Sequence, residues 1–239
     1  MVNTQWNRAQ LLVAFTLYTQ IPFGRLHSKN PEIIKHANLI ERTPSALAMK
    51  LVNIASLDPV ITSSGRSGLK GASRADKAMW QEMKGNWEQF WVESNLAMES
   101  SCNPVSDASF GINETLSSYA AKDKAALVTV RNGQKYFRKA VLSSHDNRCC
   151  ITGISNPKLL IASHIVPWAE DKNQRLNPSN GLCLSSLHDK AFDAGLLTLN
   201  ENYEVILSSV IKSEENNYIK SSFLNFEGKE ILMPKKFTP

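Results

Sequence analysis

Three side chains in the second half of the chain have the types and the order needed for metal-assisted hydrolysis. His164 follows an apolar run, Asn180 lies between Pro178 and Gly181, and His188 belongs to a short segment that alternates polar and apolar residues. A histidine whose pKa lies near neutrality can accept a proton from water, and an imidazole nitrogen can also bind a divalent metal. If strands and a helix bring these residues together, the unit can hold one metal ion and one general base.

The residues around these three positions point to a family. The segments HIVPW, NPSNGLCL and FDAGLLTL occur in this order between Arg131 and Ser209. They resemble the HNH endonucleases, in particular a restriction-type branch with an HIxPW…NGLxL…FDxGL pattern. The resemblance implies a ββα-metal fold with His164 as the general base. It also implies that Asn180 orients this histidine and stiffens the loop, and that His188 binds the metal.

One position departs from the family pattern. Relatives commonly carry Asp or His directly before the general base as a metal ligand, whereas this chain has Ser163, a weak ligand when neutral. Asp189 and Asp193 are therefore candidates for the missing carboxylate. Asp189 is nine positions from Asn180, as in many relatives, while Asp193 can equally well have a structural role before Gly195. Such a donor set with waters suits Mg²⁺ or Mn²⁺.

The cysteines do not supply the structural zinc site that many HNH proteins carry. Cys149 and Cys150 are adjacent and Cys183 is isolated, so paired CxxC spacing is absent and no structural zinc is expected. Four cysteines in 239 residues also do not make a disulfide scaffold. The chain shows no secretion-type N-terminus and no apolar run of about 20 residues. We therefore expect a cytoplasmic protein without a membrane span.

The charge of the chain favours a polyanionic partner. The formal net charge is +5 and the sequence pI is about 9.0. Basic residues gather just before the motif and in a Ser/Gly-rich loop, where they form either a solvated face or contacts to the phosphates of duplex DNA. The residues that we expect to contact DNA there are Arg131, Lys135, Arg138, Lys139, Arg148, Arg66 and Lys70.

Local patterns predict the elements that carry the motif. KLLIASHIV, preceded by the turn residues SNP, is expected to be a strand that forms a hairpin with CCITG. LSSLHDKAFDAG is expected to be a short helix that ends at Gly195.

The first hundred residues have helical periodicity. Apolar spacing and the signals Asn30-Pro31 and Thr43-Pro44 predict helices over 6–18, 31–40 and 43–56, and four aromatic residues predict a longer buried helix over 76–98. The three short helices permit two interpretations, a helix-turn-helix with Lys50 facing DNA or a packing module.

The sequence thus predicts an α+β protein with a helical N-terminal module over 1–100. DNA binding is one of the two interpretations of this module. A linker over 101–125 and an HNH nuclease domain over 126–239 follow. The expected function is metal-dependent cleavage of double-stranded DNA in a restriction or defence role, with a homodimer as one option for its assembly. The alternative is a non-catalytic DNA-binding protein whose HNH unit is degenerate, and an RNA-directed nuclease is a third option without a sequence feature of its own.

Overall fold

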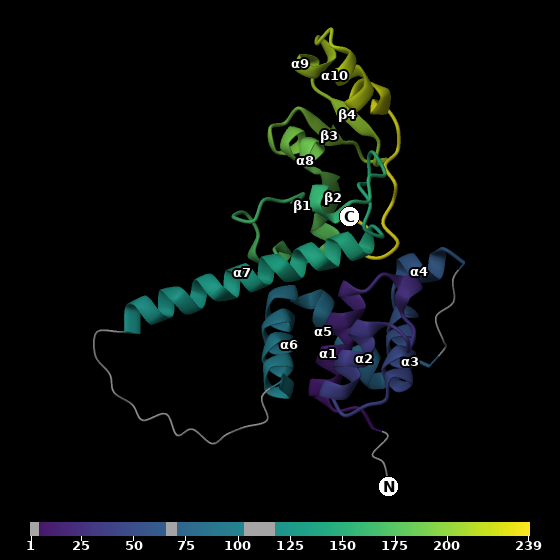
Figure 1. The fold of residues 1–239 in the computed structure, drawn as a ribbon, viewed down its shortest axis with the longest axis vertical. Coiled ribbons are helices and arrows are strands. Elements are labelled where there is room, and N and C mark those ends of the chain that lie inside the picture. Colours follow the sequence, from purple (N-terminus) through teal and green to yellow (C-terminus); the bar gives the residue numbers. More distant parts are fainter. Residues whose placement is uncertain (1–4, 66–70, 103–117) are drawn as a thin grey trace.

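A long helix, α7 (Ser118–Ser144), runs between the two parts of the protein (Figure 1). The computed structural model describes residues 5–65, 71–102 and 118–239, and the side chains of all of these except 101–130. On one side of α7 lies the helical N-terminal module that the sequence predicts. Its elements are α1 (Arg8–Gln20), α2 (Pro31–Leu39), α3 (Pro44–Ala55), α4 (Pro59–Ser63), α5 (Arg74–Gly85) and α6 (Trp87–Cys102).

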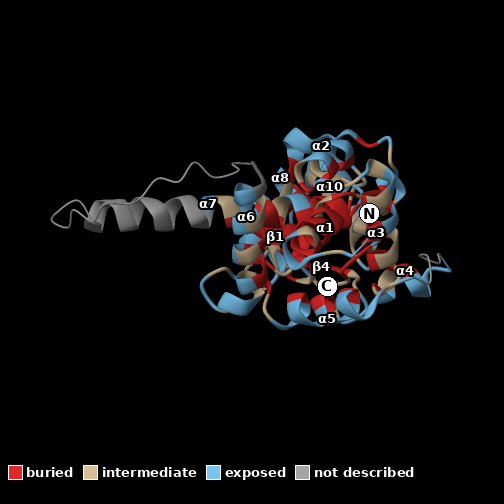
Figure 2. Ribbon diagram, turned by 90° about the horizontal axis from the view of Figure 1, so that it is seen from below, coloured by how far each residue is buried: buried red, intermediate tan, exposed pale blue. Residues whose placement is uncertain are grey.

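The starts of α2 and α3 follow from their local sequence. The side chain of Asn30 accepts a hydrogen bond from Glu32 N, and the hydroxyl of Thr43 accepts one from Ala46 N. In both helices proline occupies the first turn, where no backbone donor is needed. The predicted helices and their N-caps are confirmed. Helix α1 contributes an unbroken run of buried residues from Leu11 to Thr19, and surrounding helices enclose it (Figure 2).

The prediction of a single helix over 76–98 is wrong, because the helix is interrupted at Asn86. Its backbone is extended, with φ −154° and ψ 93°, and its side chain accepts a hydrogen bond from Gln89 N at 2.9 Å. The break places Trp80 and Trp87 around Phe237, with ring centroids at 6.1 and 5.5 Å. A contact with the far end of the chain therefore overrides a locally continuous helical pattern.

The C-terminal tail joins the two parts of the protein. Lys236 is fully buried, and its ammonium donates to the carbonyl oxygens of Tyr18, Thr19 and Ile21 and to Ser143 Oγ at 2.6–3.3 Å. These carbonyls close the C-terminal end of α1, where a cation is favourable. The buried apolar residues form one cluster that includes both parts. The boundaries of the N-terminal module, the linker and the nuclease domain stay predictions.

Beyond α7, two antiparallel strands are followed directly by a helix. Strand β1 (Leu160–His164) pairs with β2 (Gly181–Ser185), with Ser163 opposite Leu182 and His164 opposite Gly181. Helix α8 (Ser186–Asp193) begins at once and packs on both strands. The remaining elements are β3 (Leu197–Leu199), β4 (Val205–Leu207), α9 (Ser209–Lys212) and α10 (Asn217–Ser222).

The predicted hairpin between β1 and CCITG is wrong. Cys149 N donates to Ile154 O at 2.8 Å and Gly153 has φ +74°, so this segment is a tight turn. It joins the sheet by one hydrogen bond, from Cys150 N to Cys183 O at 2.7 Å. The true partner of β1 is β2, which lies beyond the loop formed by residues 165–180.

None of the helices in the described part of the chain is long and apolar enough to cross a membrane.

Candidate active site

His164 ends β1 and is fixed on several sides. Its ring lies parallel to Phe137 of α7, with centroids 3.8 Å apart and an interplanar angle of 8°, and edge-on to Trp168 at 5.5 Å. Nε2 lies 3.0 Å from Arg175 O. Because a carbonyl oxygen can only accept a hydrogen bond, Nε2 carries the proton, and in the neutral ring Nδ1 has the free lone pair.

The protonation state of His164 also suits a base. Burial lowers the pKa of His164 below its usual value, while the hydrogen bond to Arg175 O partly opposes this shift. The ring is therefore neutral near pH 7. No described residue forms a hydrogen bond with Nδ1, so this atom can accept a proton from a water molecule.

Gly181 makes the stack on His164 possible. A Cβ at this position would meet Val141 Cγ2 and would lie 2.8 Å from Phe137 Cζ. Only glycine lets α7 approach β2 this closely, and the approach brings Phe137 over the imidazole of the facing residue. The sequence did not predict Phe137 as part of the site, because an aromatic residue at helical spacing has no signal that separates stacking from ordinary packing.

Asn180 organises the loop that follows His164. Its Oδ1 accepts from Val166 N at 2.7 Å, and its Nδ2 donates to Val166 O at 3.0 Å and to Gln174 O at 3.2 Å. The side chain is only 5% exposed. Asn180 thus holds the loop, and the same loop brings the carbonyl of Arg175 to His164. This arrangement agrees with the stiffening role expected from the resemblance.

Ser163 and Asp189 form a second group beside His164. Ser163 is buried, and its hydroxyl makes no hydrogen bond of normal geometry within the described part of the chain. The hydroxyl is nevertheless near enough to Asp189 to lower the pKa of that carboxyl. Burial is the largest influence and raises the pKa of this carboxyl overall, and the nearby charge of Asp193 adds a smaller rise.

Both ring nitrogens of His188 have partners in this structure, and its expected role as a metal ligand stays a prediction. The side chain is 2% exposed, its Nδ1 lies 2.8 Å from Ser185 Oγ, and its Nε2 lies 2.8 Å from Ser222 O. Phe223 and Phe226 cover the ring at 5.0 and 6.0 Å. Nδ1 is thus paired with the N-cap residue of α8 itself, and Nε2 attaches α8 to the C-terminal segment.

Two of the basic residues expected at DNA have structural roles instead. Lys50 is 7% exposed and pairs with Asp76 at 2.9 Å, because its ammonium is enclosed between α3 and α5. The helix-turn-helix interpretation thereby loses its basic residue. Arg138 donates to Leu160 O at 2.7 Å and to Pro157 O at 2.9 Å, which attaches α7 to the start of β1.

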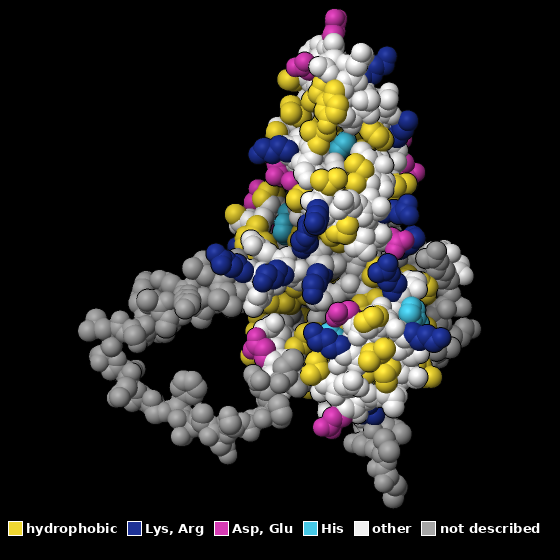
Figure 3. Space-filling view, in the orientation of Figure 1, with side chains coloured by type: hydrophobic (Ala, Val, Ile, Leu, Met, Phe, Trp, Pro, Cys, Tyr) yellow, Lys and Arg dark blue, Asp and Glu magenta, His cyan; other side chains and the backbone are white. Residues whose placement is uncertain are grey.

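Of the other basic residues expected at DNA, four are described by the structure and two are not. Arg131, Lys135, Lys139 and Arg148 are exposed. Lys and Arg side chains gather over the region where α7 crosses between the two parts (Figure 3). Arg66 and Lys70 lie outside the described residues.

The comparison with protein families agrees with this geometry. Residues 149–200 match the model of the HNH endonuclease family. The matched segment begins at the turn of Cys149 and contains β1, the loop held by Asn180, β2 and α8. The HNH segment thus supplies both His164 and Asp189. A search of curated proteins found no match.

HNH nucleases generally use a divalent metal ion, and the oxygen atoms near His164 fit one. No group of three or more His, Cys, Asp and Glu side chains in the described ranges is arranged to hold a metal. The buried hydroxyl of Ser163 and the half-buried carboxylate of Asp189 are nevertheless hard oxygen donors. Ions such as Mg²⁺ are often held by one or two carboxylates, with waters and substrate phosphate completing the shell.

Proposed function

We propose that this protein is an HNH endonuclease that hydrolyses phosphodiester bonds of double-stranded DNA. The observation that carries the proposal is the state of His164, a neutral imidazole whose Nε2 is bonded and whose Nδ1 is free, inside the segment that matches the HNH family. A base fixed in one tautomer and one orientation needs no rearrangement before it accepts a proton.

In the proposed reaction, Nδ1 of His164 takes a proton from water as the water oxygen attacks the phosphorus. The bond from phosphorus to the leaving 3′ oxygen breaks, and that oxygen takes a proton from solvent water. Phe137 and Arg175 O keep the imidazole in position, and Arg175 O also stabilises the imidazolium that forms. The Asn180 contacts hold the loop that carries this carbonyl. Each of these residues acts on His164 or on its supports.

Asp189 is the proposed principal metal ligand, assisted by the Ser163 hydroxyl and by Asp193. A bound Mg²⁺ or Mn²⁺ would neutralise charge on the phosphate and on the leaving oxygen. Asp189 then replaces the ligand that relatives carry at the position of Ser163. The exposed Arg131 and Arg148 are proposed to contact DNA phosphates near this site.

The proposed biological role is restriction, the cleavage of foreign DNA. The experiment incubates the purified protein with supercoiled plasmid DNA, modified or unmodified, in Mg²⁺, in Mn²⁺ or with a chelator. We expect nicked or linear DNA with an ion and none with the chelator, and a restriction role predicts different rates on the two plasmids. Binding of DNA without cleavage in any ion would instead establish the non-catalytic alternative that Ser163 suggests.

A further inference from the structure

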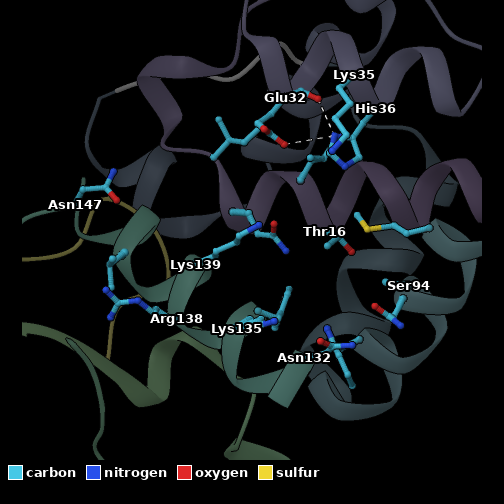
Figure 4. Close-up of a pocket in the computed structure, with 18 residues that line it drawn as sticks. Thr16, Glu32, Lys35, His36, Ser94, Asn132, Lys135, Arg138, Lys139 and Asn147 are labelled. Atoms are coloured by element: carbon cyan, nitrogen blue, oxygen red, sulfur yellow. Dashed lines mark hydrogen bonds and ion pairs between the residues drawn. The ribbon is translucent and has the colours of Figure 1, made fainter. Parts of the chain in front are cut away.

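A large cleft lies between the helical module and α7, away from His164. Its volume is about 760 Å³, and side chains from α1, α2, α6 and α7 line it (Figure 4). Phe137 and Val141 face β2, whereas Lys135 and Lys139 line the cleft. At 3.6 residues per turn, positions two apart differ by about 200°, so the two lysines project from the side of α7 opposite to Phe137.

The cleft has an excess of positive charge. Lys35 from α2 and Lys135 and Lys139 from α7 are exposed lining residues, and none has a carboxylate partner in the described ranges. Among the described residues of the lining the single acidic one is Glu32, whose carboxylate lies 3.8 Å from His36 Nδ1. Cations from two elements that are far apart in sequence therefore face one space.

A buried hydroxyl in the wall also lacks a partner. Ser94 of α6 is 1% exposed, and its Oγ makes no hydrogen bond to any described residue. Buried hydroxyls are normally hydrogen-bonded, so an unsatisfied one is unusual. Ser94 is one of the residues that form the wall of the cleft. Asn132 adds an amide to the same lining.

We propose that this cleft binds a phosphate-bearing ligand of nucleotide size, at a site separate from the scissile phosphate. Ligand sites commonly measure about 300–1,000 Å³, and the volume of this cleft lies in that range. The lysines bind the phosphate, and the Asn132 amide binds another polar group of the ligand. A free nucleotide and the phosphorylated end of a single strand share this chemistry. The inference concerns binding, so it holds whether or not the protein cleaves DNA.

The test is calorimetric titration of the full-length protein with ATP and with a 5′-phosphorylated thymidine trinucleotide. We expect at least one of them to bind, and the Lys135→Gln, Lys139→Gln double variant to bind it at least about tenfold more weakly, because two charge-assisted contacts are lost. The matched control is Lys220→Gln, Lys229→Gln, which removes the same charge from exposed positions outside the lining and should bind like wild type.

The two probes distinguish the source of the phosphate. Binding of ATP alone assigns the cleft to free nucleotides, and binding of the trinucleotide, alone or in competition with ATP, assigns it to strand ends. Either result supports the proposal. Absence of binding by both probes would overturn it, and so would equal affinity of the wild type and the Lys135, Lys139 double variant.

Discussion

The imidazole of His164 lies flat against the ring of Phe137, 3.8 Å between centroids and 8° from parallel. The two residues come from β1 and α7, and they approach because Gly181 has no side chain between them. A general base needs a fixed direction as well as a suitable pKa. The stack therefore connects the packing of α7 with the proposed chemistry at the end of β1.

Phe137→Leu should lower the cleavage rate at saturating DNA by roughly 10–100-fold, because the imidazole is free to turn. DNA affinity should change little, since Phe137 is buried. The acid limb of the pH–rate profile should also move toward higher pH, because a better-hydrated His164 has a higher pKa. Phe90→Leu, a buried substitution in the helical module, controls for lost stability. An unchanged rate and profile in Phe137→Leu would show that the stack is only packing.

Gly181→Ala should destabilise the protein by about 1–3 kcal/mol, because the new methyl group overlaps Phe137 and Val141. The matched variant is Gly24→Ala, whose Cβ meets nothing within 4 Å and which should be close to neutral. Urea unfolding of both variants measures the difference. Equal stability of the two would mean that α7 does not approach β2 as closely as described.

Lys236→Ala should be far more costly than Lys235→Ala. The first leaves the carbonyls at the end of α1 buried without their donor, at a cost of about 3 kcal/mol. The second removes an exposed pair with Asp146, worth at most about 1 kcal/mol. Thermal unfolding of the two neighbouring variants provides the measurement, and similar midpoints would contradict the buried position of Lys236.

The free energy of unfolding should decrease as the pH is lowered, because of His145. Burial lowers the pKa of His145 from 6.5 to about 4, so the unfolded state binds a proton first as the pH drops. The contribution of His145 to the free energy of unfolding is therefore fully present above pH 6.5, and it is lost progressively as the pH falls toward the pKa of the folded state. Between pH 7 and pH 5 the wild type should lose about 2 kcal/mol more than His145→Gln, which cannot titrate. Parallel stability profiles in urea unfolding would place His145 in water.

Local signals predicted what depends on local structure. Asn30 and Thr43 start their helices because the caps and the prolines act within one turn. The order of His164, Asn180 and Asp189 was also readable, and residues 149–200 match the HNH family. Contacts between distant segments were not readable. Lys50 looks like a surface residue in the sequence, but it forms a buried ion pair with Asp76. The carbonyl of Ser222, from a distant segment, lies within hydrogen-bonding distance of His188.

Single-turnover plasmid cleavage by His164→Ala, with DNA affinity measured in parallel, tests most directly whether His164 is the general base. Loss of a general base typically costs about 10²–10⁴-fold in rate, and DNA affinity should stay near the wild-type value. Asp189→Asn should also impair cleavage, and extra Mg²⁺ should partly restore it. His27→Ala, an exposed histidine in the helical module, is the control and should cleave normally. Cleavage by folded His164→Ala at the wild-type rate would contradict the assignment of His164 as the base.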